Sequence, residues 1–294
     1  MLRHPNVLLL LLFTFLPVPA VAEKLCIWEF KSGGVEIILL GSIHSLTQEM
    51  YPLPAAIDRV YSRAEKLVFE VDLTQLNARD ISLIMERRGL FQDGKTLEQN
   101  LQPETLSLLQ GYLREHNIGM TRVYRMKPWY LTLTIGQQEL QRLGYQPNLG
   151  IDQVLQQRAL KDGKTILQLE SFQEQIDFLS GDSPAIQDLA LRASLEDRSS
   201  IAEDIQMLLD AWSVGDADKM LELSLNAPSR YSELQTQMNS LIDFRNTKMI
   251  ERIREYAEEG LGTYLVVIGA LHMGGENGII RKLSEDYEIT QLSN

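Results

Sequence analysis

Short apolar runs near the two ends of the chain predict β-strands, and longer stretches with helical spacing fill the middle. Residues 25–30 and 35–40 are apolar runs separated by Lys31-Ser32-Gly33-Gly34, which predicts a hairpin with glycine in its turn. A short helix and a last strand near Ile289 are expected after Gly278. Three further short apolar runs predict buried strands: residues 66–71, 165–169 and 264–268.

Apolar residues spaced three and four positions apart predict helices between these strands. Pro54, Pro103 and Pro128 each open such a stretch, as proline does at a first helical position. Ser171 and Glu174 have the spacing of a capping box at a helix start. Another helix is expected over residues 151–163.

A last long amphipathic helix is marked by apolar residues from Met249 to Ala257 and should end at Gly260. Residues 183–239 are expected to be helical, without defined boundaries. The pattern predicts an α/β fold with a central, mainly mixed β-sheet flanked by helices. We expect one domain over residues 23–294, with two pseudo-repeat halves and a helical insertion.

The first 22 residues have the features of a cleaved secretory signal. Positive charge at Arg3 precedes an apolar run over residues 7–16, and small residues at positions 20–22 suit a cleavage site. The alternative, a membrane anchor, needs about 20 apolar residues, and Pro17 interrupts the run too early. We therefore expect an exported protein, periplasmic or extracellular, with no membrane contact after cleavage.

Charge and cysteine content narrow the function further. The 294 residues carry a formal charge of −12 and no clustered basic stripe, so a nucleic-acid partner is not expected. Cys26 is the single cysteine, which excludes an internal disulfide. We expect Cys26 to be packed on the first strand, with an interchain disulfide as the alternative.

Two histidines share a Gly-x-x-His frame that directly follows an apolar strand. These frames are Gly41-Ser42-Ile43-His44 and Gly269-Ala270-Leu271-His272. The crevice beyond the carboxyl ends of strands is where ligands bind in open α/β sheets. Each glycine is expected to allow a tight turn through its unrestricted φ. The alternative is that the rings of His44 and His272 only make local hydrogen bonds. His116, by contrast, is expected on the solvated surface.

Acidic residues occur at matching places. Glu70 and Glu170 each end a predicted strand, and Asp72 shares the face of Glu70 if the strand alternation continues. Two imidazoles and two carboxylates at strand ends suggest two half-repeats that share one site. Such a donor set suits zinc, manganese or iron, which lower the pKa of a bound water and polarise a carbonyl.

Arg245 lies in a polar segment at the expected start of the last long helix. It could hold a developing oxyanion or a substrate carboxylate, and an ordinary ion pair is the alternative. Nucleophilic mechanisms have less support, because no Gly-x-Ser-x-Gly elbow is present and Cys26 has no histidine near it in sequence.

The order of these motifs resembles the TraB/GumN family, which is related to the Tiki proteases. The first half carries Trp28, Leu39-Leu40-Gly41-Ser42-Ile43-His44, Phe69-Glu70-Val71-Asp72 and Lys127-Pro128-Trp129. The second half carries Gly150-Ile151-Asp152-Gln153-Val154-Leu155, Gly163-Lys164-Thr165-Ile166, Leu169-Glu170, Gln175, Arg245-Asn246, Met249 and Val267-Ile268-Gly269-Ala270-Leu271-His272 with Gly274. The resemblance covers the chain from about Trp28 to Leu292.

The resemblance implies an α/β fold shared with erythromycin-esterase-like proteins. It also implies a site built from His44, Glu70, Glu170 and His272, with Arg245 in support. Tiki proteins are divalent-metal-dependent peptidases, and TraB is associated with dampening a peptide pheromone signal. We therefore expect a divalent ion such as Mn, Co or Zn at His44, Glu70 and His272, with Glu170, Arg245 and Asp72 as catalytic residues.

Three functional hypotheses follow. The first is an exported metal-dependent hydrolase, acting on peptide bonds or on a small ester or amide. The second is a peptide-binding or sequestering protein without catalysis. The third is a metal-independent, esterase-like hydrolase in which His44 acts as general base.

Overall fold

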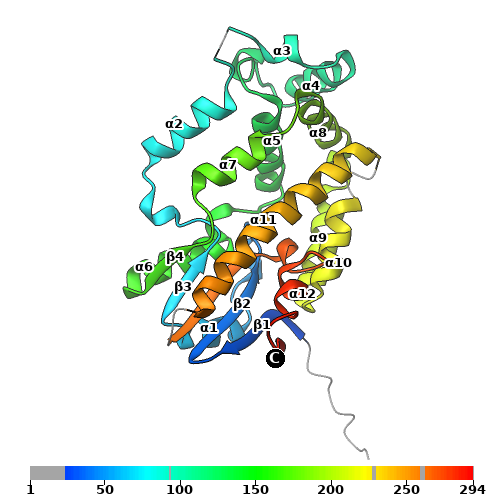
Figure 1. Ribbon diagram of the computed structural model, residues 1–294. Helices are drawn as coiled ribbons and strands as arrows, with labels where there is room; N and C mark the ends of the chain where they lie inside the picture. Colours follow the sequence, from blue (N-terminus) through cyan, green and yellow to red (C-terminus); the bar gives the residue numbers. More distant parts are fainter. Residues whose placement is uncertain (1–23, 93, 227–229, 259–261, 294) are drawn as a thin grey trace, which may run out of the picture.

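The computed structural model describes residues 24–92, 94–226, 230–258 and 262–293 (Figure 1). The expected signal segment, residues 1–22, and the expected helix end at Gly260 lie outside these residues. Within the described part, six strands form one sheet at the lower end of the molecule as drawn in Figure 1. They are β1 (Lys24–Ser32), β2 (Val35–Ser42), β3 (Lys66–Phe69), β4 (Thr165–Gln168), β5 (Gly262–Gly269) and β6 (Thr290–Ser293).

The sheet is mixed, in the strand order β4-β3-β5-β2-β1-β6. Neighbouring strands are parallel from β4 to β2, whereas β1 is antiparallel to both β2 and β6. The predicted hairpin is confirmed as β1 and β2, with Ile27 opposite Leu40 and Gly33 at a φ of +55° in the turn. The α/β fold with a mixed sheet is therefore confirmed.

Four parallel strands place their carboxyl ends at the same edge of the sheet. β2 and β5 pair along their whole length, from Val35 beside Gly262 to Ser42 beside Gly269. This register brings the two Gly-x-x-His frames next to each other, although more than 200 residues separate them in the chain. The site can therefore be assembled from the ends of β2, β3, β4 and β5.

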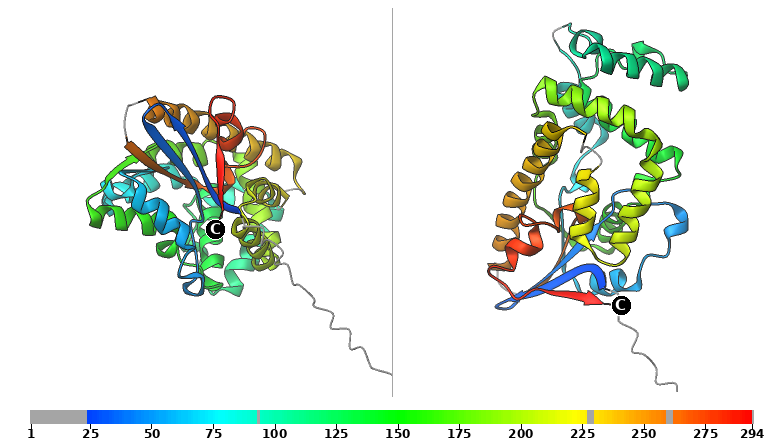
Figure 2. Two further views of the ribbon diagram at one scale, coloured as in Figure 1. Left: turned by 90° about the horizontal axis from the view of Figure 1, so that it is seen from below. Right: turned by 90° about the vertical axis from the view of Figure 1, so that its right-hand side faces the viewer.

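Helices cover both faces of the sheet (Figure 2). α1 (Ala55–Arg63) and α6 (Ile151–Asp162) connect parallel strands on one face, and α11 (Ser232–Glu258) runs along the other with α12 (Ile279–Leu283) beside it. The chain crosses the sheet in one direction from β2 to β4 and in the opposite direction from β4 to β5. With right-handed crossovers, this reversal places the connecting helices on opposite faces of the sheet.

The other helices form a layer above the sheet in Figure 1 and along its side. Part of this layer has its own apolar cluster, which includes Leu109, Tyr112, Leu131 and Leu191. The helices are α2 (Ala78–Gly89), α3 (Leu97–Asn100), α4 (Pro103–Glu115), α5 (Pro128–Arg142), α7 (Phe172–Ser180), α8 (Pro184–Glu196), α9 (Ile201–Ser213) and α10 (Ala217–Asn226).

Most of the predicted helix starts are confirmed. Pro103 and Pro128 begin α4 and α5, and Pro54 is the residue that precedes α1. The capping box is present, because the Glu174 carboxylate accepts from the Ser171 backbone N–H at 2.9 Å, and the Ser171 hydroxyl accepts from the Glu174 backbone N–H at 3.2 Å. The predicted internal repeat is not confirmed by this arrangement.

Two expectations about position were wrong. The last long helix begins at Ser232, so Arg245 lies near its middle and not at its start. His116 is not a solvated surface residue, because only 12% of its side chain is exposed, at the end of α4 between Arg142 and Arg198. Aromatic contact with Tyr112 accounts for part of this burial.

Cys26 is buried on β1, which confirms the expected packing. Burial raises the pKa of its thiol to about 12. In the part of the chain that the structure describes, no helix has the length and apolar content needed to cross a membrane.

Candidate active site

The two Gly-x-x-His frames lie at the same edge of the sheet but place their rings differently. His272 belongs to a 3-10 turn, residues 270–272, that follows β5 directly, and it is buried. His44 follows β2 in a loop, and 62% of its side chain is exposed. The site therefore has one enclosed imidazole and one that solvent can reach.

The glycines of these frames are needed for space and not for an unusual φ, which corrects the sequence-based explanation. Gly269 has an ordinary φ of −51°, and Gly41 is not among the positive-φ residues. A Cβ on Gly269 would lie 2.8 Å from His44 Nε2 and 3.1 Å from Glu70 Oε1. On Gly41 it would lie 2.5 Å from Cys26 Sγ. The missing side chain of Gly269 thus leaves the space that the His44 ring and the Glu70 carboxylate occupy.

Glu70 and Glu170 extend from neighbouring strands. Backbone pairing continues past the ends of β3 and β4, since the Glu170 N–H donates to the Glu70 carbonyl at 2.9 Å. Both side chains are almost completely buried. A buried carboxylate is costly unless it is paired, so the partners of this pair define the centre of the site.

Arg245 from α11 is the main partner of both carboxylates. Its Nη2 atom donates to Glu70 Oε2 at 2.6 Å and to Glu170 Oε1 at 2.5 Å, and its Nε donates to Glu170 Oε2 at 3.3 Å. Gln175 from α7 adds weaker contacts, with its amide nitrogen 3.4 Å from Glu70 Oε2 and 3.3 Å from Glu170 Oε1. One guanidinium thus neutralises much of the charge of two acids.

The orientation of His272 is set by residues on both of its nitrogens. Asn246 donates through Nδ2 to the Asn277 carbonyl at 2.9 Å, which turns its Oδ1 toward His272 Nδ1 at 2.6 Å. An amide oxygen only accepts, so Nδ1 carries the proton and Nε2 presents a lone pair. That lone pair accepts from Arg245 Nη1 at 3.1 Å. Burial lowers the pKa of His272 to about 4, so the ring is neutral at neutral pH.

His44 lies between two carboxylates. Its Nδ1 atom is 3.1 Å from Asp152 Oδ1, and its Nε2 atom is 4.0 Å from Glu70 Oε1. Apart from this ion-pair contact, the buried Oδ1 atom of Asp152 has no hydrogen-bond partner among the described residues. Desolvation lowers the pKa of His44, but Asp152 and then Glu70 outweigh it and raise the pKa to about 9.

The two glutamates differ in their pKa shifts. Burial raises the pKa of Glu70, but the charges of His272, His44 and Arg245 and the Gly269 N–H outweigh it and lower the pKa to about 2. At neutral pH His272 is neutral, so the charged His44 ring, 4.0 Å away, and the guanidinium, 2.6 Å away, keep Glu70 ionised. Burial raises the pKa of Glu170, and Arg245 offsets only part of that effect. Paired carboxyl groups with opposite shifts are typical of acid–base sites.

The structure does not bring Asp72 into this network. β3 ends at Phe69, so the strand alternation that placed Asp72 on the face of Glu70 does not continue. Asp72 instead caps the 3-10 turn at residues 73–75, where its Oδ1 accepts from the backbone N–H of Thr74 at 2.9 Å and from the Thr74 hydroxyl at 2.6 Å. The other five predicted site residues, His44, Glu70, Glu170, Arg245 and His272, form one connected group.

Three contributors received no role from sequence reasoning: Asp152, Gln175 and Asn246. Asp152 reaches His44 because the start of α6 packs directly against the His44 loop. The packing is so close that a Cβ added to Gly150 would lie 2.3 Å from the His44 carbonyl oxygen. Asn246 follows Arg245 directly on α11. All three belong to the motifs that carried the family resemblance, and that position is the signal that could have found them.

The side chains present have the chemistry that a divalent ion requires. Both rings have Nδ1 next to an outer partner, Asp152 for His44 and Asn246 for His272, as is typical of metal-binding histidines. The ionised Glu70 lies beside both. Within the described residues, however, no three histidine, cysteine, aspartate or glutamate side chains are close enough to one another to form a metal cluster. Arg245 lies between Glu70, Glu170 and His272.

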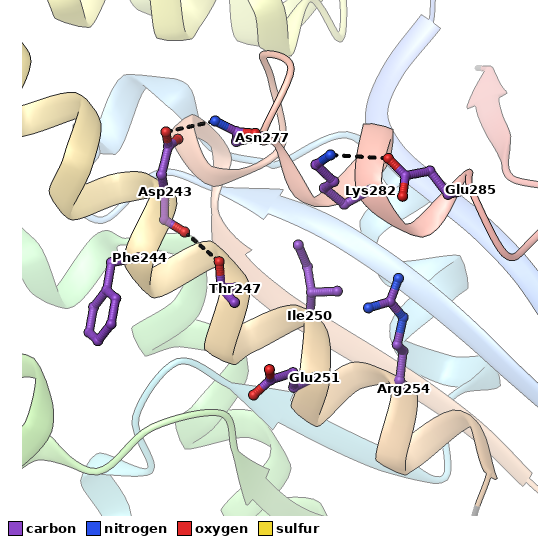
Figure 3. A pocket seen from close by; sticks show the side chains of 9 residues that line it. All are labelled: Asp243, Phe244, Thr247, Ile250, Glu251, Arg254, Asn277, Lys282 and Glu285. Carbon is purple, nitrogen blue, oxygen red and sulfur yellow. Dashed lines mark hydrogen bonds and ion pairs between the residues drawn. The ribbon is translucent and has the colours of Figure 1, made fainter.

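A separate cavity of about 380 Å³ lies between α11 and α12 (Figure 3). Asp243 accepts from Asn277 Nδ2 at 2.7 Å at one end of it, and Lys282 donates to Glu285 at 3.1 Å at the other. These four polar side chains are therefore paired with each other. Its contribution to the site is indirect, because the Asn277 residue held by Asp243 also orients Asn246 through its carbonyl.

Comparison with known proteins agrees with these motifs. The model of the TraB/PrgY/gumN family matches residues 26–291. Two similar proteins are both named uncharacterized protein YbaP. The one from Escherichia coli (strain K12) is 25% identical over 258 residues, which are 85% of this chain and 89% of that protein. The one from Shigella flexneri is 25% identical over 252 residues, 83% and 86% of the two chains. No solved structure matches.

Proposed function

This chain belongs to the TraB/PrgY/gumN family, and from that premise we propose that it is a hydrolase of peptide bonds. One observation carries the proposal: two imidazoles and two buried carboxylates from four strand ends meet at one sheet edge, and each ring has a polar partner beside its Nδ1 atom. Oriented Nε2 atoms beside an ionised carboxylate suit hydrolysis better than simple recognition.

His44, Glu70 and His272 are the residues that would hold a divalent ion. Such an ion would lower the pKa of a bound water and polarise the substrate carbonyl. His272 offers its Nε2 lone pair, because Nδ1 carries the proton that Asn246 accepts. His44 is the exposed member of the group, so we assign substrate entry to its side of the site.

Glu170 is the proposed general base and acid. Its buried carboxyl group has a raised pKa, which moves it toward the working pH of a proton-transfer group. Arg245 has a supporting role, because its Nη2 and Nε donors are committed to Glu70 and Glu170. Arg245 is therefore proposed to hold the Glu70 and Glu170 carboxylates in place.

A second candidate, metal-independent hydrolysis with His44 as general base, is favoured by one specific contact. Asp152 lies 3.1 Å from His44 Nδ1, which is the arrangement of an imidazole oriented by a carboxylate. Because the pKa of His44 is raised to about 9, the ring would act as a base only at alkaline pH. The two candidates share their residues and differ in whether activity depends on a metal ion.

The compartment is part of the same proposal. Residues 1–22 have the charge and apolar pattern of a secretory signal, so the hydrolase is proposed to act in the periplasm or outside the cell. Detection of a mature N-terminus near residue 23 in an extracytoplasmic fraction, by mass spectrometry, would support this part. An intact Met1 in the cytoplasmic fraction would contradict it.

The function is tested by incubating the purified mature protein with a peptide library and detecting cleavage products by mass spectrometry. Metal content is measured on the same samples, with and without chelator. The variants His44→Ala and Glu170→Gln should lose cleavage, whereas the surface control Glu251→Gln should retain it, since Glu251 is exposed on α11.

The outcomes separate the hypotheses. Cleavage that chelator abolishes and added Mn²⁺ restores supports the metal-dependent hydrolase. Chelator-resistant cleavage that still requires His44 supports the metal-independent form. Saturable peptide binding with no products from the wild-type protein would overturn both and favour a binding protein.

A further inference from the structure

The central feature of the site is the cationic side chain of Arg245, which lies among acceptor atoms of the proposed metal ligands. The Arg245 guanidinium contacts His272 Nε2 at 3.1 Å, Glu70 Oε2 at 2.6 Å and Glu170 Oε1 at 2.5 Å. Only 12% of the Arg245 side chain is exposed. A guanidinium stays charged at every pH of interest, so it neutralises this site permanently.

The same acceptor atoms are the ones that a metal ion would use. A hydrogen bond to His272 Nε2 and a metal–nitrogen bond both require its single lone pair. The Glu70 carboxylate is also engaged on both oxygens, because Oε1 accepts from the Gly269 N–H at 2.7 Å while Oε2 accepts from Arg245. Two of the three proposed metal ligands are thus held in hydrogen bonds.

We propose that Arg245 is a built-in competitor of the divalent cation, which must withdraw from His272 and Glu70 before a metal ion can bind there. The inference rests on the proposed metal-dependent function and concerns how that site is loaded. It assigns Arg245 a specificity role, because only a cation that binds Glu70 and His272 more strongly than the guanidinium does will enter. Arg245 does not contact His44, so the competition concerns Glu70 and His272 only.

Neighbouring residues allow such an exchange. Gln175 donates to Glu70 and Glu170 independently of Arg245, so the two acids keep a polar partner when the guanidinium leaves. Asn246 holds His272 through Nδ1, a contact that does not involve Nε2. The ligands therefore keep their orientation while the cation changes.

The test is calorimetric titration of the metal-free full-length mature protein with MnCl₂. Arg245→Gln should bind Mn²⁺ at least about tenfold more tightly than wild type, because charge-assisted hydrogen bonds no longer have to be broken. Arg252→Gln is the matched control: Arg252 lies on the same helix, is half exposed and pairs with Glu255, so its loss should leave affinity unchanged.

Each result decides a separate question. Equal or weaker Mn²⁺ binding by Arg245→Gln overturns the competition and leaves the proposed metal-dependent function standing. Absence of Mn²⁺ binding by both proteins, with Zn²⁺ and Co²⁺ giving the same result, overturns the metal-dependent function and the competition with it.

A crystal structure of the wild-type protein with Mn²⁺ keeps the inference testable if Arg245→Gln does not fold. It also separates displacement from simple charge repulsion. Anomalous density for manganese on Glu70 and His272, with the guanidinium moved away from both, supports the proposal. Manganese bound there while Arg245 keeps its contacts to Glu70 and His272 overturns it.

Discussion

Asn246 Oδ1 and His272 Nδ1 are joined by a 2.6 Å hydrogen bond, and the preceding residue of α11, Arg245, holds the other nitrogen of the same ring at 3.1 Å. Two consecutive helix residues therefore determine both the tautomer and the orientation of one imidazole. α11 is therefore part of the site as well as a helix packed on the sheet. Substitutions of Arg245 or Asn246 should change the properties of the His272 ring directly.

Asn246→Asp is predicted to raise the pKa of His272 above its value of about 4, because a carboxylate stabilises the charged ring where an amide does not. NMR titration of the His272 ring protons in metal-free protein measures this shift. Asn148→Asp adds the same charge at an exposed position and should leave the titration unchanged. An unaltered His272 pKa in Asn246→Asp would contradict the assigned hydrogen bond.

Asp152→Asn is predicted to lower the pKa of His44 from about 9 toward its usual value, by at least about one unit, because the nearest negative charge is removed. The His44 ring protons report this shift by NMR in metal-free protein. Asp72→Asn is the control, since Asp72 caps a neighbouring turn and its amide replacement can still accept from Thr74. A His44 titration that responds to Asp72 and not to Asp152 would refute the assignment.

The sequence predicted the strand-end chemistry because it depends on local patterns. Apolar runs located β2, β3, β4 and β5, and the rule that parallel strands end at one edge brought together His44, Glu70, Glu170 and His272. Asp72 failed because the alternation that places side chains applies only inside a strand, and β3 ends three residues earlier. The Asp72 side chain turns instead toward Thr74, whose hydroxyl donates to it.

The remaining errors arise where long-range contacts act. Asp152 reaches His44 only because the start of α6 packs on the His44 loop, a contact between segments about a hundred residues apart that no local pattern reveals. The start of α11 was missed because residues 183–239 were predicted to be helical without defined boundaries, so the first turns of α11 were not joined to the helix that follows them. His116 was placed on the surface because its sequence neighbours are polar, whereas Tyr112 packs against its ring.

Glu70 should make the folded state sensitive to acid. Its pKa of about 2 in the folded protein lies below its usual value of 4.5, so the unfolded chain binds the proton first as the pH falls. The stabilisation is complete above about pH 4.5 and is lost between there and pH 2. A shift of this size corresponds to about 3 kcal/mol.

Urea unfolding of the wild type and of Glu70→Gln between pH 6 and 3 tests this contribution. The free energy of unfolding should fall less steeply with decreasing pH in Glu70→Gln, whereas the exposed control Glu251→Gln should follow the wild type. Parallel curves for the wild type and Glu70→Gln would show that Glu70 is not held ionised in the folded protein.

Alanine at the two motif glycines is predicted to have different effects, although both occupy the first position of a Gly-x-x-His frame. On Gly41 a Cβ would lie 2.5 Å from Cys26 Sγ and 3.1 Å from Ala270 Cβ, inside the core. Gly41→Ala should therefore destabilise the protein by about 1–3 kcal/mol through overpacking. Adding Cys26→Ala should recover part of this loss, since it removes the closest atom.

On Gly269 the same change would meet His44 Nε2, which can move because the His44 ring is largely exposed, and the Glu70 carboxylate, which is buried and held by Arg245. Gly269→Ala should cost less stability than Gly41→Ala. It should reduce hydrolysis or Mn²⁺ affinity at least about tenfold, because changing a residue that positions metal ligands typically has an effect of that size. Thermal unfolding and calorimetric titration of both variants provide the comparison. If Gly41→Ala damaged Mn²⁺ binding without destabilising the fold, the steric explanation for the paired glycines would be wrong, and they would act through backbone conformation instead.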